Sequence, residues 1–429
     1  MAKMTRRTFL GSSAMAVIVA GMRAQGKVFG ANGRVRMGVI GLHGRGGGHM
    51  RDCLERQEGV ELAAICDPDR QVMEERLAQA KQMSGKTPKT YVDMRELFAD
   101  ATVDAVSVCT PNHWHALAAI WACESGKDVY VEKPLSHNVR EGRVLAEVAE
   151  RTGRIVFHGT QQRSNARVKR DIGLLREGII GDVVHARGFV YKTTKRQSIG
   201  FAPNAEAPGH LDWDIWQGPA QGREYCANYV HYNWHWFWEY GNGEIGNQGV
   251  HEMDVAVWGI GKGAPVRVYS TGGRYGWEDQ GETPNTQTTC FTYADGTVLT
   301  FEVRNLGSYG DGGFGGVGNS LFGTKGYYVR DKGFFDYQNQ PIAVDEIEEA
   351  EDHRGAFIKA VLSRKPEDVP VTPLEGHISC LHCHLGNIAY RLKRSLEFDP
   401  ETERFRGDEE ANALLTRPYR EPFVAAGLA

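Results

Sequence analysis

Short apolar runs alternate with longer helical patterns between residues 35 and 158. The apolar runs have the length of strands, and the segments between them repeat apolar residues at helical spacing. Strands that alternate with helices predict a parallel sheet with helices on both faces. Ligands of such sheets bind beyond the carboxyl ends of the strands. The expected strands are 35–40, 60–66, 90–92, 105–109, 128–131 and 155–158.

Beyond residue 160 this alternation gives way to strand patterns, several of them separated by turn residues. Such a pattern favours an antiparallel sheet, which can leave one face uncovered. We expect the open face to carry a partner subunit in a homo-oligomer. The expected strands are 183–191, 266–272, 286–293, 297–304, 320–323 and 327–330, and the expected helices are 166–177, 249–259, 354–363 and 375–393.

The composition is that of a folded protein and narrows its partners. Hydrophobic residues make up 41% of the 429 residues, charged residues make up 24%, and the net charge is −4 at pH 7. This charge gives no electrostatic reason to expect nucleic acid as a partner. The 52 glycines follow no collagen period and form no Gly/Ser linker. One glycine-rich segment, 307–318, carries no motif, and we expect a mobile loop at a subunit edge or over the substrate.

The first residues have the pattern of an export signal. Arg6 and Arg7 precede Phe9 and an apolar stretch at 14–22, which is the order found in twin-arginine (Tat) signals. The stretch is far shorter than the roughly 18 residues that span a bilayer. We predict a signal and linker over 1–31, cleavage near Ala24, and a periplasmic or otherwise exported protein without a membrane anchor. Loss of the signal, with its four cations and no acids, takes the net charge from −4 to −8.

The cysteines do not have the spacing of a small disulfide scaffold, so mostly buried thiols are expected. The segment 380–384 formally reads Cys-x-x-Cys-His, which is the pattern of haem attachment. Apolar residues at helical spacing through this segment favour a buried helix with reduced thiols instead. The thiols expected to be buried are Cys53, Cys66, Cys109, Cys123 and Cys290.

A glycine turn follows the first strand, and an acid, Asp67, follows the second. Glycines let main-chain N–H groups approach a pyrophosphate at a helix N-terminus, and the acid accepts hydrogen bonds from ribose hydroxyls. His43 replaces the middle glycine of the usual pattern. Asp67 would repel a 2′-phosphate, so NAD is favoured over NADP, although Arg70 leaves NADP open. The cofactor residues predicted here are Gly41, His43, Gly44, Arg45, Gly46 and Asp67.

Polar residues also follow the expected strands 105–109 and 128–131, at 110–115 and 132–134. With the glycine turn and the segment 249–254, these motifs resemble, in their order, the Gfo/Idh/MocA oxidoreductases. The resemblance implies a Rossmann domain at 32–158 and, at 159–429, an α+β domain with a large, mostly antiparallel sheet. It also implies a nicotinamide cofactor and a sugar, polyol or related substrate. Further predicted cofactor residues are Thr110, Asn112, His115, Glu132 and Lys133.

The same resemblance places Lys133 near the nicotinamide and the reacting carbon. The family's Asp-x-x-x-His pair corresponds to Asn247 and His251, so the histidine is retained and the acid is replaced by an amide. An amide can orient an imidazole but supplies no charge, which makes His251 harder to protonate. We therefore expect Lys133 and His251 to share the proton transfer, with Asn247 beside them.

Aromatic and imidazole side chains gather between residues 231 and 240. Aromatic faces beside hydrogen-bonding groups suit sugar rings, although for Trp236 and Trp238 a core cluster is an equally good interpretation. His231 and His235 have a spacing that could ligate a metal on a helix, but no third ligand follows, so no metal is predicted. The predicted substrate-binding residues are Gln162, Arg163, His231, Tyr232, Trp234, His235 and Asp254.

These observations favour an exported NAD-dependent oxidoreductase acting on a hydroxyl or carbonyl of a sugar, glycoside or polyol. Free NAD should be scarce outside the cytoplasm, so the cofactor is expected to be tightly held. Two alternatives stay open. One is a redox-neutral NAD-dependent glycosidase or lyase that acts through a transient keto-sugar. The other is a non-catalytic sugar-binding protein with structural NAD.

Overall fold

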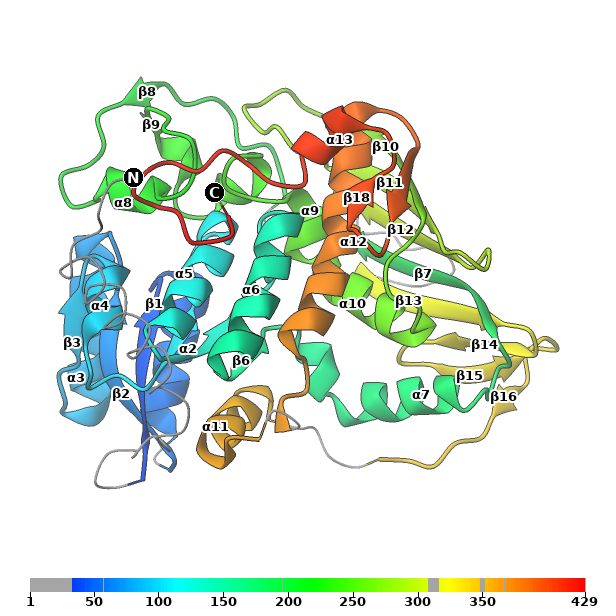
Figure 1. Ribbon diagram of the computed structural model, residues 1–429, viewed down its shortest axis with the longest axis horizontal. Coiled ribbons are helices and arrows are strands. Elements are labelled where there is room, and N and C mark those ends of the chain that lie inside the picture. The colour runs from blue at the N-terminus through cyan, green and yellow to red at the C-terminus, as the bar shows by residue number, and fades with distance from the viewer. Residues whose placement is uncertain are drawn as a thin grey trace, which may run out of the picture.

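The predicted parallel sheet is present in the computed structural model, with six strands in the order β3-β2-β1-β4-β5-β6 (Figure 1). The structure describes residues 33–56, 58–194, 196–307, 316–347, 352–365 and 368–428. The signal and linker and residues 308–315 of the glycine-rich segment lie outside these ranges. The strands are β1 (Val35–Ile40), β2 (Val60–Cys66), β3 (Lys89–Tyr91), β4 (Ala105–Val108), β5 (Asp128–Val131) and β6 (Val156–His158).

Helices connect these strands, and their starts are set by polar caps. Asp69, Asp93 and Asn138 accept main-chain N–H groups at the first turns of three of them. The central strands β4 and β5 are buried along their whole length, as expected for a parallel sheet covered on both faces. The helices are α2 (Gly44–Glu55), α3 (Arg70–Ser84), α4 (Met94–Ala99), α5 (Asn112–Glu124) and α6 (Val139–Thr152).

The second sheet has ten strands in the order β16-β15-β14-β13-β7-β12-β11-β10-β17-β18. Only the β7–β12 pair is parallel among its described pairs, so the sheet is mostly antiparallel, and the predicted fold class is confirmed. Its strands are β7 (Val183–Tyr191), β10 (Arg267–Gly273), β11 (Thr286–Thr292), β12 (Val298–Arg304), β13 (Gly316–Gly323), β14 (Gly326–Val329), β15 (Gly333–Asp336), β16 (Pro341–Ile342), β17 (Leu396–Asp399) and β18 (Arg404–Phe405). A separate small sheet pairs β8 (Asn204–Ala205) with β9 (Tyr225–Cys226).

Two helices of this domain, α10 (Gly249–Ile260) and α12 (Pro373–Leu392), pack against the large sheet (Figure 1). Thr372 and Glu375 form a capping box at the start of α12, with a proline in the first turn. The other described helices are α7 (Ala166–Arg176), α8 (Trp213–Gln217), α9 (Gly243–Asn247), α11 (His353–Ser363) and α13 (Glu409–Ala413), with short 3₁₀ turns at η1 (Gln161–Ser164), η2 (Ala227–Tyr229) and η3 (Asn233–Trp236).

Part of the chain beyond residue 350 completes the first domain. Phe357 and Val361 of α11 belong to the same core as Val39 of β1, and α12 packs along α6. The first domain therefore takes its sheet from the N-terminal third of the chain and part of its cover from near the other end.

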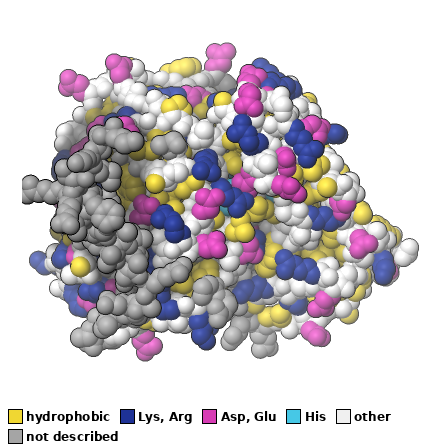
Figure 2. Space-filling model, in the orientation of Figure 1, with side chains coloured by type: hydrophobic (Ala, Val, Ile, Leu, Met, Phe, Trp, Pro, Cys, Tyr) yellow, Lys and Arg dark blue, Asp and Glu magenta, His cyan; other side chains and the backbone are white. Residues whose placement is uncertain are grey.

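The face of the molecule seen in Figure 2 carries charges of both signs. Figure 2 shows Lys and Arg side chains interspersed with Asp and Glu on the face in view, in keeping with the near-neutral net charge. Across the ranges that the structure describes, no helix combines the length and apolar character needed to cross a membrane.

Candidate active site

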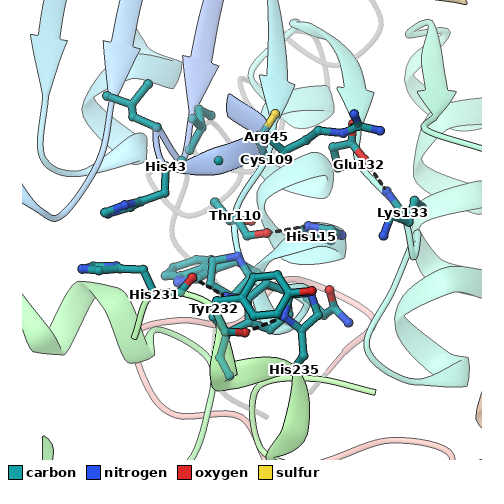
Figure 3. Close-up of a pocket in the computed structure, with 18 of the residues that line it drawn as sticks. His43, Arg45, Cys109, Thr110, His115, Glu132, Lys133, His231, Tyr232 and His235 are labelled. Carbon is teal, nitrogen blue, oxygen red and sulfur yellow. Dashed lines mark hydrogen bonds and ion pairs between the residues drawn. The ribbon is translucent and has the colours of Figure 1, made fainter. Parts of the chain in front are cut away.

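A cavity of about 540 Å³ lies beyond the carboxyl ends of β1, β2, β4 and β5, where the second domain closes over the first (Figure 3). This is the edge at which an open parallel sheet binds its ligands. Most predicted site residues line it: Gly41, His43, Gly44, Arg45, Asp67, Thr110, Asn112, His115, Glu132, Lys133, Gln162, His231, Tyr232, Trp234, His235, Asn247 and His251.

The glycine turn has the close approaches that a dinucleotide site needs. Gly41 has a φ of +81°, and a Cβ there would lie 2.7 Å from the Cys109 carbonyl oxygen. A Cβ on Gly46 would lie 1.6 Å from the Gly41 carbonyl oxygen, so the first turn of α2 packs directly on the loop. Gly44 has open space where its Cβ would be, and the His43 side chain does not cap α2. Among the described residues no side chain caps this helix start, so its main-chain N–H groups can bind a pyrophosphate and the residues fit a dinucleotide.

Asp67 directly follows β2, at the position where an acid was predicted to bind the ribose hydroxyls of the cofactor. Its carboxylate accepts the main-chain N–H groups of Leu42 at 2.6 Å and Asp69 at 2.9 Å. Burial raises the pKa of Asp67 to about 7, against the opposing effect of these two hydrogen bonds. The carboxylate thus holds the glycine turn in place while it lines the cavity.

Glu132 organises the cations at the end of β5. Its Oε1 accepts from Arg45 Nε at 2.9 Å and contacts His49 Nε2 at 3.0 Å. Burial alone would raise the pKa of Glu132, but the His49 hydrogen bond and the Arg45 and Lys133 charges outweigh it and hold that pKa well below its usual range. Glu132, directly before Lys133 in the chain, is therefore ionised at neutral pH.

The amine of Lys133 is fixed across the domain boundary. Its Nζ donates to the main-chain carbonyl of Asn247 at 2.8 Å and to the Asn247 Oδ1 at 3.2 Å. Burial lowers the pKa of Lys133 to about 8, although the carboxylates of Glu132 and Glu244 oppose this effect. The amine can thus exchange a proton near neutral pH.

His251 lies in the first turn of α10 and lines the same cavity. Burial, followed by the charge of Lys133, lowers the pKa of His251 well below its ordinary value. Its imidazole is therefore neutral at physiological pH, because of burial and the neighbouring lysine. The Asn247 amide holds Lys133 instead, and it makes no hydrogen bond to His251 within the described chain.

His115 joins the two strand-end loops that carry the site. Its ring nitrogens contact the carbonyl oxygens of Pro134 at 2.6 Å and Thr110 at 2.7 Å. Asn112 donates to Asn242 Oδ1 at 3.0 Å and so links the start of α5 to the loop before α9. These polar residues fix the shape of the cavity wall as well as lining it.

The aromatic segment forms another wall. Tyr232, Trp234 and His235 line the cavity, and the rings of Trp234 and His235 stack at 3.5 Å. Trp236 is buried in the protein, as the core interpretation expected, and Trp238 packs near Tyr390. His235 Nδ1 contacts the Tyr232 carbonyl oxygen at 2.6 Å, whereas His231 stacks on His43. His231 lies before the short 3₁₀ turn η3, so the two histidines do not share the helix face on which they could have bound one metal ion.

The polar residues of the cavity that were missed from the sequence include Lys192, Arg196 and Gln248. Lys192, directly after β7, donates to Gln248 Oε1 at 2.6 Å. Arg196 forms a two-pronged ion pair with Glu244 at 2.8 and 2.9 Å. Lys192, Arg196 and Gln248 all line the cavity. Their only signal in the sequence was their position just after the predicted strand 183–191 or just before His251.

Two predicted substrate residues, Arg163 and Asp254, do not line the cavity, and this prediction needs correction. The Asp254 carboxylate is fully buried and accepts from the Arg163 guanidinium at 3.0 to 3.2 Å and from Ser379 Oγ at 2.7 Å. Arg163 also binds Glu375 at 2.8 Å and lies over the ring of Trp258. A buried charge requires a partner, and this pair joins η1, α10 and α12 instead of reaching substrate. Gly46 also lies outside the lining, because it packs beneath the turn.

The Cys-x-x-Cys-His segment lies in the buried part of α12. Cys383 Sγ donates to the Ile245 carbonyl oxygen at 3.2 Å, and Cys380 Sγ accepts from the Leu135 N–H at 3.2 Å. His384 Nε2 contacts Ser136 Oγ at 3.1 Å. These contacts use the thiols and the imidazole in packing α12 against its neighbours. Of the other cysteines expected to be buried, Cys109 and Cys290 are partly exposed.

Two family descriptions match the chain. "Oxidoreductase family, NAD-binding Rossmann fold" matches residues 35–160, and "Oxidoreductase family, C-terminal alpha/beta domain" matches residues 164–425. Both are parts of the Gfo/Idh/MocA group. The boundary between the matches falls directly after the parallel sheet, where the sequence changes its pattern.

Curated relatives include "Glycosyl hydrolase family 109" proteins from Shewanella. The protein from Shewanella pealeana is 34% identical over 174 residues, which are 39% of this chain and 37% of the relative. The protein from Shewanella sp. strain W3-18-1 is 33% identical over 159 residues, which are 35% of this chain and 34% of the relative. The chain thus matches about a third of the length of these relatives.

Solved structures share the fold. GenD2 from gentamicin A biosynthesis, in complex with NAD, has a TM-score of 0.61 at 20% identity, over 88% of this chain and 100% of that chain. The WlbA dehydrogenase from Bordetella pertussis, in complex with NADH and UDP-GlcNAcA, has a TM-score of 0.62 at 18% identity, over 85% and 99%. An apo scyllo-inositol dehydrogenase from Lactobacillus casei has a TM-score of 0.60 at 17% identity, over 85% and 98%.

Proposed function

Since the chain belongs to the Gfo/Idh/MocA family of oxidoreductases, we propose that it is an NAD-dependent oxidoreductase acting on a hydroxyl or carbonyl of a sugar, glycoside or polyol. The observation that carries this proposal is the position of the Lys133 amine. It is tied to Asn247 in the wall of the cavity, and burial brings its pKa to about 8. His251 lines the same cavity as a neutral imidazole.

A nicotinamide cofactor, held by the glycine turn and Asp67, would supply the hydride acceptor or donor. Lys133 transfers the proton. In oxidation its neutral amine accepts the proton of a substrate hydroxyl, and in reduction its ammonium donates a proton to the carbonyl oxygen. Asn247 keeps the Nζ in place through two oxygen acceptors. His251 orients the substrate oxygen as a neutral hydrogen-bonding partner, because its low pKa keeps it uncharged.

The rest of the cavity supports a carbohydrate substrate. Tyr232 and Trp234 offer aromatic faces to apolar C–H groups, and Gln162, Lys192 and Gln248 offer polar groups for hydroxyls. Fold relatives named above include an inositol dehydrogenase and a dehydrogenase crystallised with UDP-GlcNAcA, which fits this substrate class.

The cofactor end supports NAD over NADP. Asp67 lines the cavity, and an acid directly after the second strand of this fold accepts hydrogen bonds from the ribose hydroxyls of NAD and would repel a 2′-phosphate. Arg70 was the residue because of which NADP remained possible. It is exposed on α3 and does not line the cavity. Because the Tat pattern at Arg6 and Arg7 indicates export, we propose that the protein works outside the cytoplasm with a tightly held cofactor and no nucleic-acid partner. We also propose a homo-oligomer formed through the open face of the large sheet.

A second candidate is redox-neutral cleavage of a glycoside. It is favoured by the relatives named as glycosyl hydrolase family 109, which match at 33–34% identity over about a third of their length. In that case the same lysine and histidine would move protons at neighbouring carbons, and no reduced cofactor would accumulate.

The deciding experiment begins with the protein as purified. Mass spectrometry identifies any bound dinucleotide, and a panel of sugars, glycosides and polyols is then tested for an NADH absorbance and for released free sugar. A reduced cofactor without glycoside cleavage supports the oxidoreductase, and free sugar without net reduction supports the second candidate. Lys133→Met keeps the apolar stem and removes the amine, and Lys86→Ala, on the surface beside Glu61, is the matched control. Full turnover by the Lys133→Met protein would refute the assignment.

A further inference from the structure

Three potential metal ligands from distant parts of the chain meet at one edge of the cavity. They are His43 in the glycine turn, Asp69 at the start of α3, and His231 before η3. Their ligand atoms all lie within 4.8 Å of one another. Asp69 Oδ2 is 3.6 Å from His43 Nε2 and 3.2 Å from His231 Nε2. Figure 3 shows the two imidazoles lying close together, across the view from Lys133.

We propose that His43, Asp69 and His231 form a binding site for a divalent transition-metal ion, of which Zn²⁺ is the best match. Imidazole nitrogens and a carboxylate oxygen are ligands that Zn²⁺ accepts. A tetrahedral Zn²⁺ with bonds of about 2.0 to 2.1 Å separates its ligand atoms by about 3.3 to 3.4 Å. The separations of 3.2 and 3.6 Å between the carboxylate oxygen and the two imidazole nitrogens bracket that value.

The ligand atoms are available for a metal. His43 Nε2 is shielded from solvent and has no hydrogen-bond partner among the described residues. Asp69 uses its other oxygen, Oδ1, to cap α3 through the Gln71 N–H at 3.0 Å and to contact His210 Nδ1 at 2.8 Å. The Oδ2 atom is therefore left for the site, and the hydrogen bonds at Oδ1 fix the carboxylate in the way that outer partners orient metal ligands.

The two imidazoles lie against each other. Their rings stack with centroids 3.7 Å apart and planes 20° apart, so their lone pairs lie in nearly parallel planes. Because an imidazole binds a metal in the plane of its ring, one ring has to turn out of the stack before both Nε2 atoms bind the same ion.

The location suggests what the ion would do. His43 and Asp69 belong to the first domain and His231 to the second, so a bound ion would join the two walls of the cavity. His43 and His231 both line the cavity. Three protein ligands leave a fourth position for water or for an oxygen of a ligand in the cavity. The ion would thus hold the domains together at the glycine-turn end, apart from the proton transfer at Lys133.

The test uses the full-length protein without substrate. The protein is treated with a chelator, dialysed, and titrated with Zn²⁺ alone by calorimetry, with the bound metal measured by mass spectrometry. We expect one Zn²⁺ per chain and a rise in the melting temperature on binding. His43→Ala/His231→Ala should lose that ion, whereas His185→Ala, which removes a histidine of β7 that contacts Thr300, should keep it. His210→Ala should weaken binding without abolishing it.

A spectroscopic measurement on the unaltered protein keeps the proposal testable if the double variant fails to fold. Co²⁺ in place of Zn²⁺ should give the intense visible absorption of a tetrahedral site, and added Zn²⁺ should remove it. Weak octahedral absorption alone would contradict the proposal. So would equal Zn²⁺ uptake by the native protein and the folded double variant, because that result indicates binding by other surface histidines only.

Discussion

The amine of Lys133 donates to two oxygens of Asn247, the main-chain carbonyl at 2.8 Å and the side-chain Oδ1 at 3.2 Å. Lys133 belongs to a strand-end loop of the first domain, and Asn247 ends α9 in the second. The position of the proposed proton-transfer group therefore depends on both domains. The amide, which replaces the acid of the family pattern, acts on the lysine and leaves His251 without a charged partner at that position.

Removal of the Lys133 amine should abolish most of the turnover. General acid–base groups contribute about 10²- to 10⁴-fold to rates, so Lys133→Met should lower kcat by that amount. Retained cofactor, measured by mass spectrometry of the purified variant, would show that the loss lies in the chemistry. A loss confined to KM would instead assign Lys133 to substrate binding.

The rate of alcohol oxidation should rise with pH until the Lys133 amine is neutral. The pKa of Lys133 is lowered to about 8, so kcat/KM should increase up to about pH 8 and level off above it. In the direction of carbonyl reduction, which needs the ammonium, the rate should fall through the same pH range. Measuring the pH–rate profile in both reaction directions tests this opposite dependence. Profiles that rise or fall together would contradict the assignment of Lys133.

Asn247→Asp should move that inflection upward. The new carboxylate would lie within hydrogen-bonding distance of the Lys133 amine and would stabilise its charged form. An opposite charge at this range shifts a pKa by about one to three units. The inflection of kcat/KM should therefore move above pH 8 by at least about one unit. An unchanged profile would show that a group other than Lys133 controls it.

The Arg163–Asp254 pair should matter for stability rather than for substrate affinity. Arg163→Met leaves the Asp254 carboxylate buried without its cation, and breaking such a pair costs about 3 to 5 kcal/mol. Urea denaturation should show this loss, and Arg163→Met/Asp254→Asn should recover part of it. An unchanged unfolding free energy together with a raised KM would restore the original assignment to substrate binding.

Gly46→Ala should disrupt the dinucleotide site. Its Cβ would lie 1.6 Å from the Gly41 carbonyl oxygen, so the turn and the start of α2 must move apart. Gly48→Ala, in the same helix with open space at the Cβ position, is the matched control. Gly46→Ala should lose affinity for NAD in a titration, and Gly48→Ala should keep it.

The sequence predicted those parts of the fold whose pattern is local. The alternating strand 183–191 is β7 to the residue, and the glycine turn lies where strand, helix and acid indicated. The outer strands β15 to β18, of two to four residues each, were missed, because runs this short give a weak periodic signal, which was read for the equally short β14 but not for its neighbours. Most of their pairs are local hairpins, and β17 also pairs with the distant strand β10.

The sequence predicted those residues of the site that belong to recognisable motifs, and it missed those that only the packing of the domains brings together. Nearly every residue of α10 is buried, so periodicity could not show that His251 faces the cavity while Asp254 faces Arg163. The meeting of His43, Asp69 and His231 depends on the packing of one domain on the other, and no spacing in the sequence encodes it. Lys192 and Arg196 escaped notice for the same reason.

Helix α11 has a consequence for biosynthesis. The dinucleotide-binding half takes core residues from a segment that is translated some 200 residues after its last strand. A ribosome that has made only the first 160 residues holds a sheet with part of one face bare. The half-finished chain would be exposed to proteases and chaperones until residue 363 has emerged, and an isolated fragment ending near residue 160 should be poorly soluble.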